Sequence, residues 1–237
     1  YLKSGDAQKA IIFLENALKG THKKEFKTRL IFILAQLYAE EGNFKASTYY
    51  EWVVNRNPDY DMAFQAKINR ALSFSGGDSK AIKAQLLKML KDDKNIEYFD
   101  QIYFALAEIA FSDGEEDLAI EYLMTSVRVS VKNKKQKAKS LQKLGDWNYM
   151  KDEYLLAYQY YDTIQQVWDN DSVAKSKTMK RYKTLELIYQ NSKIKASEIA
   201  DLANKNDRNA ISAINQMYKI LVVSIINNIF LNGSLGG

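Results

Sequence analysis

Cysteine, histidine and proline are absent or rare in this sequence. Its 237 residues include no cysteine, one histidine and one proline, Pro58. Without cysteine there is no disulfide framework and no thiolate to act as a nucleophile or metal ligand. With so few breakers, the abundant alanine, leucine, lysine and glutamate residues favour helix almost throughout and disfavour a strand-rich fold. We therefore expect an all-α protein.

A long apolar run is also missing. The longest, Ile220 to Phe230, contains two asparagines and is well short of the roughly 20 residues needed to span a bilayer. As a helix it would need to be covered, either by the last repeat or by another subunit. Since the chain starts at Tyr1 without a signal-peptide pattern, we expect any targeting signal to lie outside these residues.

Neither basic nor acidic residues dominate the sequence. The formal net charge of +5 comes from 34 basic and 29 acidic residues. This modest excess does not require a nucleic-acid partner, and basic residues do not alternate with stacking aromatics as RNA-binding surfaces demand. We expect no nucleic-acid ligand.

What the sequence does contain is a repeat. One small or apolar position recurs at intervals of 36, 36, 37 and 38 residues: Ala10, Ala46, Ile82, Ala119 and Ala157. A turn position recurs at nearly the same intervals: Gly5, Gly42, Gly77, Gly114 and Asp152. This period, slightly longer than the tetratricopeptide unit, predicts a right-handed tetratricopeptide-repeat solenoid of helix-turn-helix pairs.

The segment Glu40 to Pro58 shows why the spacing matters. Gly42 allows a left-handed exit from the first helix, and Ala46 permits a close helix crossing. Tyr50 and Val53 follow on the same helical face and should pack on the next repeat. Pro58 cannot continue the hydrogen-bond ladder, so it should end the second helix.

The repeat register predicts two regions. Residues 1–191 form about five units, the third of them degenerate, and the helical pattern Lys175 to Asn191. Residues 192–237 form C-terminal capping helices, including a helix from Ala196 to Tyr218, and a flexible tail. The tail ends in a glycine-rich stretch, whose role the pattern leaves open.

No catalytic constellation is visible. The single histidine, His22, reads as an exposed loop residue without a triad partner. The stretch Ser75 to Lys80 lacks the frame of a phosphate-binding loop and is better explained as a repeat turn. The basic run Lys132 to Lys139 could contact phosphate or an acidic partner, but a solvated loop between repeats also explains it. We expect no enzyme activity, no cofactor and no metal.

The first helices of a tetratricopeptide stack line a concave groove, which suits a peptide or a partner helix. The register places aromatic, acidic and amide side chains there. The predicted partner-binding residues are Arg29, Phe32, Gln36, Phe104, Glu108, Phe111, Gln142, Asp146 and Tyr149.

Beyond the repeat class, the segment Gly77 to Ile164 resembles the tetratricopeptide region of large outer-membrane lipoproteins of the Bacteroidetes type IX secretion and gliding-motility machinery, the SprE/PorW type. The stretches LLKMLKDDKN, DQIYFALAEIA and QKAKSLQKLGD carry the likeness. Arg56 to Leu72 fits the same family, and Ala203 to Met217 fits it more loosely. The resemblance implies a scaffold on the periplasmic face of the outer membrane, held by a lipid anchor outside this fragment.

The resulting expectation is a non-catalytic protein-protein interaction scaffold that links the secretion translocon to other subunits of the complex. Two alternatives remain: a general peptide-binding tetratricopeptide adaptor, and a regulatory module of a larger protein. Membrane contact would come only through the lipid anchor.

Overall fold

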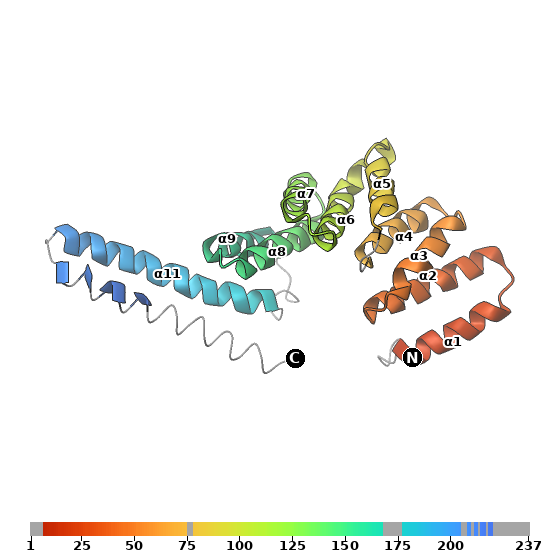
Figure 1. Ribbon diagram of the computed structural model, residues 1–237, viewed down its shortest axis with the longest axis horizontal. Coiled ribbons are helices and arrows are strands. Elements are labelled where there is room, and N and C mark those ends of the chain that lie inside the picture. Colours follow the sequence, from red (N-terminus) through yellow and green to blue (C-terminus); the bar gives the residue numbers. More distant parts are fainter. Residues whose placement is uncertain are drawn as a thin grey trace. The chain divides into compact units, whose positions relative to one another are not determined.

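The computed structural model describes residues 7–74, 78–167, 177–204 and, beyond them, residues 208–219 except 210, 213 and 217. Within these residues the chain is helical and contains no strand, which confirms the all-α prediction (Figure 1). The helices are α1 (Ala7–Gly20), α2 (Lys24–Glu40), α3 (Lys45–Asn55), α4 (Tyr60–Leu72), α5 (Lys80–Met89), the 3-10 helix η2 (Asp93–Tyr98), α6 (Phe99–Ser112), α7 (Glu116–Val129), α8 (Lys134–Met150), α9 (Tyr154–Val167) and α11 (Lys177–Asn204).

The helices follow each other as hairpin pairs, α2 with α3, α4 with α5, α6 with α7 and α8 with α9, the arrangement of a tetratricopeptide solenoid. The chain divides into two compact units, residues 1–140 and 141–237, and the division falls inside α8. The domain boundary predicted after residue 191 stays a prediction.

One sequence-based helix assignment is wrong. Separate helices were expected over Lys175 to Asn191 and from Ala196 onward, but α11 runs without a break to Asn204. The polar residues between the two patterns include no glycine or proline, so nothing there interrupts the backbone hydrogen bonds. The turn positions Gly5 and Gly77 and the apolar run Ile220 to Phe230 lie outside the described residues.

Three of the predicted turn positions adopt the same left-handed backbone. The φ angles are 64° at Gly42, 78° at Gly114 and 63° at Asp152. After each, the next amide donates to a carbonyl five residues back, as from Asn43 to Tyr38 at 2.8 Å. This is the 6→1 bond of a Schellman motif, which caps helix ends through a left-handed residue. The glycine spacing therefore reflects the way that each first helix ends.

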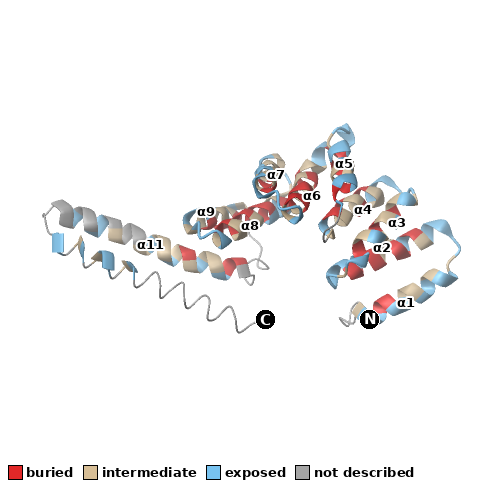
Figure 2. Cartoon of the chain, in the orientation of Figure 1, coloured by how far each residue is buried: buried red, intermediate tan, exposed pale blue. Residues whose placement is uncertain are grey.

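The small position of the repeat is buried in every unit. Ala119 and Ala157 are fully buried, Ala46 is 1 % exposed, and Ile82 fills the same place in the degenerate pair α4–α5. Buried residues lie along the sides of helices that face their neighbours (Figure 2). In unit 1 they form one core around Leu34 and Val53 and another around Leu86 and Leu106. The register predicted from the alanines is thus confirmed.

Polar groups are buried where α6, α7 and the start of α8 meet. The Ser126 hydroxyl donates to the Asp100 carbonyl at 2.7 Å and lies 2.7 Å from the Ser140 hydroxyl. Ser130 donates to the Asp100 carboxylate at 2.7 Å, and the Gln136 amide reaches Ser140 at 3.3 Å. All five residues are buried. Of these bonds, the Ser126–Ser140 contact is the one that crosses from the α6–α7 pair to α8, so it links the first turns of α8 to that pair.

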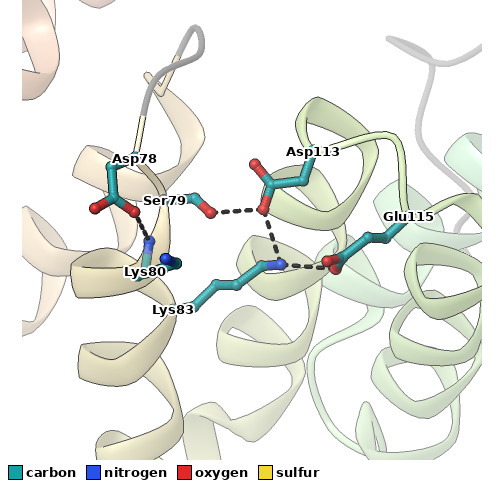
Figure 3. Close-up of polar contacts among 6 residues, drawn as sticks. All are labelled: Asp78, Ser79, Lys80, Lys83, Asp113 and Glu115. Carbon is teal, nitrogen blue, oxygen red and sulfur yellow. Dashed lines mark hydrogen bonds and ion pairs between the residues drawn. The ribbon is translucent and has the colours of Figure 1, made fainter.

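A second polar cluster joins α5 to the turn between α6 and α7 (Figure 3). Lys83 pairs with Asp113 at 2.8 Å and with Glu115 at 2.6 Å, while Ser79 donates to Asp113 at 2.6 Å. The bond from Lys83, with that from Ser79, holds the pKa of Asp113 below its usual value. Burial would lower the pKa of Lys83, but its two carboxylate partners outweigh that effect and raise it.

Candidate protein-binding surface

The predicted site residues on α2 form one stripe. Arg29, Phe32 and Gln36 are three and four residues apart, so they share a helical face. Arg29 and Gln36 are exposed. Phe32 is half-buried and its ring lies edge-on to Tyr50, with the centroids 5.8 Å apart. Phe32 therefore contributes to the core as well as to the surface.

The C-terminal end of this stripe opens into a hollow of about 710 Å³ in unit 1. Residues from the ends of α2 and α4, the turn before α3, α3 itself and the start of α8 line it: Gln36, Ala39, Glu40, Gly42, Asn43, Phe44, Tyr50, Asn69, Leu72, Ser73, Phe74 and Lys139. Its volume lies in the range of pockets that enclose a drug-sized ligand. First helices of three different pairs thus contribute to one concave surface.

Gln36 is the predicted site residue that lines the hollow. Sequence reasoning missed the others for identifiable reasons. Asn69 and Leu72 belong to the degenerate pair, where no register was assigned to the first helix. Lys139 lies three residues before the predicted Gln142, so it could have been found by extending the α8 stripe backwards.

The apolar and aromatic side chains of the hollow differ in exposure. Phe44 is 73 % exposed and Leu72 is 40 % exposed, whereas Tyr50 is buried. Burial raises the pKa of the Tyr50 hydroxyl to about 12, so it stays protonated at neutral pH. The hollow therefore offers exposed apolar groups, a hydroxyl and amides, with Glu40 and Lys139 as its charged residues.

On α6, the predicted residues Phe104, Glu108 and Phe111 share a face at spacings of four and three. All three are half-buried, and they are not among the residues that line the hollow. They stay predicted contacts for a partner.

In unit 2, two of the three predicted residues on α8 contact one side chain of α11. Asp146 pairs with Arg181 at 2.6 Å and accepts a hydrogen bond from Tyr161 at 2.7 Å. The Arg181 guanidinium lies 4.5 Å from the centroid of the Tyr149 ring, a cation–π contact. Gln142 is exposed. The structure thus brings Asp146 and Tyr149 together around Arg181, which sequence reasoning did not select.

This cluster shifts the ionisation of its tyrosines. Burial raises the pKa of Tyr161, and its hydrogen bond to the Asp146 carboxylate raises it further. Burial also raises the pKa of Tyr149, against the opposing effect of the Arg181 charge. Both hydroxyls are therefore protonated at neutral pH. The arrangement holds α11 against α8 and provides no group poised for acid-base chemistry.

Two other groups considered from the sequence are His22 and the stretch Ser75 to Lys80. His22 is exposed between α1 and α2. Of the stretch Ser75 to Lys80, residues 75–77 lie outside the described residues, and Ser79 donates to Asp113. No group of three or more histidine, aspartate and glutamate side chains in the described ranges could hold a metal ion. Among the helices that the structure describes, none is both long enough and apolar enough to cross a membrane.

Comparison with known families agrees with this architecture. Residues 100–130, which cover α6 and α7, match the tetratricopeptide repeat family. Proteins with such repeats are generally non-catalytic, and the repeats generally mediate binding to other proteins. No curated protein sequence matches the chain. The matched segment contains Gly114 and Ala119, so it includes both marker positions of the repeat. Residues 100–130 are therefore a tetratricopeptide repeat.

Proposed function

We propose that the chain is a non-catalytic scaffold that binds other proteins, and that a segment of a partner occupies the hollow of unit 1. The hollow itself carries the proposal, because first helices of three hairpin pairs line it together. The tetratricopeptide repeat at residues 100–130 supports a binding role. A concave surface built across several repeats is the form in which such stacks take an extended peptide or a helix.

The composition of the lining fits a peptide ligand. Phe44, Leu72 and Phe74 supply apolar surface, while Asn43 and Asn69 supply amide groups that can bond a peptide backbone. A partner side chain that covers Leu72 and Phe44 would remove apolar area from water and so gain affinity. The charged residues at the edge would then select among partners.

We further propose that the partners are subunits of a type IX secretion or gliding-motility complex. The full-length protein would lie on the periplasmic face of the outer membrane, held by a lipid anchor, and join the translocon to other subunits. The support for this is the resemblance of Gly77 to Ile164 to that lipoprotein family.

Photo-crosslinking in cells tests both levels of the proposal. A photoreactive phenylalanine analogue would replace Gln36 or Leu72 in the hollow, Phe104 on α6, or Tyr149 on α8. Matched controls at the exposed positions Thr48 and Glu121 lie outside the hollow. Captured proteins would be identified by mass spectrometry in cells of the native organism. We expect capture from Gln36 and Leu72 and little from the two control positions.

The identity of the captured proteins separates the alternatives. Secretion-machinery subunits would support the finer proposal, whereas soluble client peptides alone would favour a general peptide-binding adaptor. Equal capture from the hollow and from Thr48 and Glu121 would contradict a binding role for the hollow.

A further inference from the structure

Five lysines cluster at the start of α8, and one of them, Lys139, lines the hollow of unit 1. They are Lys132, Lys134, Lys135, Lys137 and Lys139, in the loop before α8 and its first turns. Within the part of the chain that the structure describes, none of them contacts a carboxylate or an aromatic ring. We call these five residues the lysine patch.

The buried network orients the lysine patch. Gln136 and Ser140 are buried and bonded to each other, and Ser140 contacts Ser126 of α7, so this side of α8 faces the α6–α7 pair. Lys135 and Lys139 are exposed and four residues apart, so they share the outward face of α8. Lys139 lines the hollow. Lys135, one helical turn earlier, therefore extends the positive charge along α8 away from the hollow.

Folding does not explain this charge. Lysines four residues apart on a helix repel each other. Those in the first turn of α8 also face the positive end of the helix dipole, and that turn contains no acidic residue. A cluster that works against the helix carrying it is best explained by an anionic partner.

We propose that unit 1 binds an acidic segment of a partner protein. Its carboxylates contact Lys135 and Lys139, and a neighbouring apolar side chain enters the hollow against Phe44 and Leu72. The inference rests on the proposed protein-binding function and adds the chemistry of the partner.

The spacing of the two lysines favours an extended segment. Four residues of helix rise about 6 Å. Alternate side chains of an extended chain are separated by about 6.6 Å and point to the same side. Acidic residues at positions i and i+2 would therefore reach Lys139 and Lys135 together, and the apolar residue should lie on the hollow side of this pair.

The shape and the sequence argue for a protein rather than another anion. Lys139 lines a concave surface, which a flat bilayer cannot enter. Residues 132–143 contain no aromatic side chain, and single-stranded nucleic acids need such side chains for stacking. Phe44, Leu72 and Phe74 instead offer apolar contacts of the kind that peptide side chains use.

The test uses a display library of random dodecapeptides, selected on the 237-residue chain. Selection is repeated on the double variant Lys135→Glu/Lys139→Glu and on Lys19→Glu/Lys88→Glu. The second pair has the same change in net charge at exposed lysines outside the hollow. Circular dichroism checks that both variants fold, and the affinity of an enriched peptide is measured by fluorescence anisotropy at low and high salt.

We expect enriched peptides with acidic residues at alternate positions next to an aromatic residue or leucine. Their affinity should fall at least about tenfold in Lys135→Glu/Lys139→Glu and with added salt, but stay within about twofold in the control variant. Equal affinity for the two variants would overturn the inference.

Three other outcomes would also count against the inference. Enrichment of uncharged or basic peptides whose binding is lost in Leu72→Asp would overturn the acidic partner while leaving the hollow as a peptide site. Absence of any enriched peptide would contradict both proposals. Lysine-dependent sedimentation with phosphatidylglycerol vesicles, without enrichment of acidic peptides, would assign the lysine patch to a membrane surface instead.

Discussion

Gly145 on α8 lies directly against the ring of Tyr161 on α9. A Cβ atom added at Gly145 would come within 2.7 Å of Cδ1 of Tyr161, closer than van der Waals contact allows. Tyr161 is fully buried and its hydroxyl donates to Asp146. Moving the ring away from Gly145 would disturb this bond and the packing around the ring.

The substitution Gly145→Ala should lower the free energy of unfolding by about 1 to 3 kcal/mol, the cost of overpacking. This would reverse the usual gain from replacing glycine by alanine within a helix. Gly20→Ala is the matched control, because a Cβ there meets no atom within 4 Å. Urea unfolding of both variants measures the difference, and a Gly145→Ala protein as stable as Gly20→Ala would contradict the close packing.

Replacing a turn glycine should cost stability through the backbone alone. A Cβ at Gly114 meets no atom within 4 Å, but its φ angle is 78°. We expect Gly114→Ala to lose about 1 to 2 kcal/mol, the penalty of left-handed backbone for other residues. The equivalent substitution Gly42→Ala, where φ is 64°, should lose a similar amount. Thermal and urea unfolding would show it; values like that of Gly20→Ala would argue against the capping role.

The small repeat position should reject a large side chain. Ala119 is fully buried between helices, so Ala119→Trp should lower the melting temperature sharply because the indole forces the helices apart. Ala84→Trp places the same ring at an exposed position of α5 and should have little effect. Differential scanning calorimetry compares the two variants. Similar melting temperatures would show that the repeat register is misassigned.

The cluster around Lys83 should make stability depend on pH in acid. Hydrogen bonds from Lys83 and Ser79 hold the pKa of Asp113 below its ordinary 3.8. The folded state then binds this proton less readily than the unfolded chain, so the stabilisation is present above pH 3.8 and is lost as pH falls through the lowered pKa. Asp113→Asn should reduce that acid-induced loss.

The measurement is urea unfolding of both proteins from neutral pH down to acid. Asp117→Asn, at an exposed position of α7, serves as the control and should follow the wild-type profile. If Asp113→Asn and wild type lost stability in parallel, the ion pair would be absent in solution.

The periodic features of the sequence were sufficient to predict the repeat. Only a small side chain fits where Ala46 and Ala119 are buried, and the backbone at Gly42 must be left-handed. The spacing of these residues alone therefore identified the close helix crossing and the turn. The apolar face of α5 was strong enough to place Ile82 despite its larger size. Local rules of this kind require no knowledge of distant contacts.

Contacts between distant residues were not visible in the sequence. Ser126 and Ser140 look like ordinary surface positions, and their burial depends on finding each other across two helices. Arg181 lies beyond the point where the register fades, so its contacts with Asp146 and Tyr149 could not be anticipated. The hollow depends on three helices converging, and only Gln36 of the nine predicted residues lines it. Its partner, like the other eight positions, stays a matter of prediction.

The hydroxyl contacts of Ser126 have a consequence for how such an array can change. The Ser126 hydroxyl bonds the Asp100 carbonyl within the α6–α7 pair and also contacts the Ser140 hydroxyl of α8, so it joins the pair to the next helix. An extra hairpin inserted after α7, or a swap of neighbouring hairpins, would separate the Ser126 and Ser140 hydroxyls and place buried polar groups against a new neighbour. At this junction a new neighbour would therefore need a polar partner of its own for these hydroxyls, so the hairpins are not freely interchangeable.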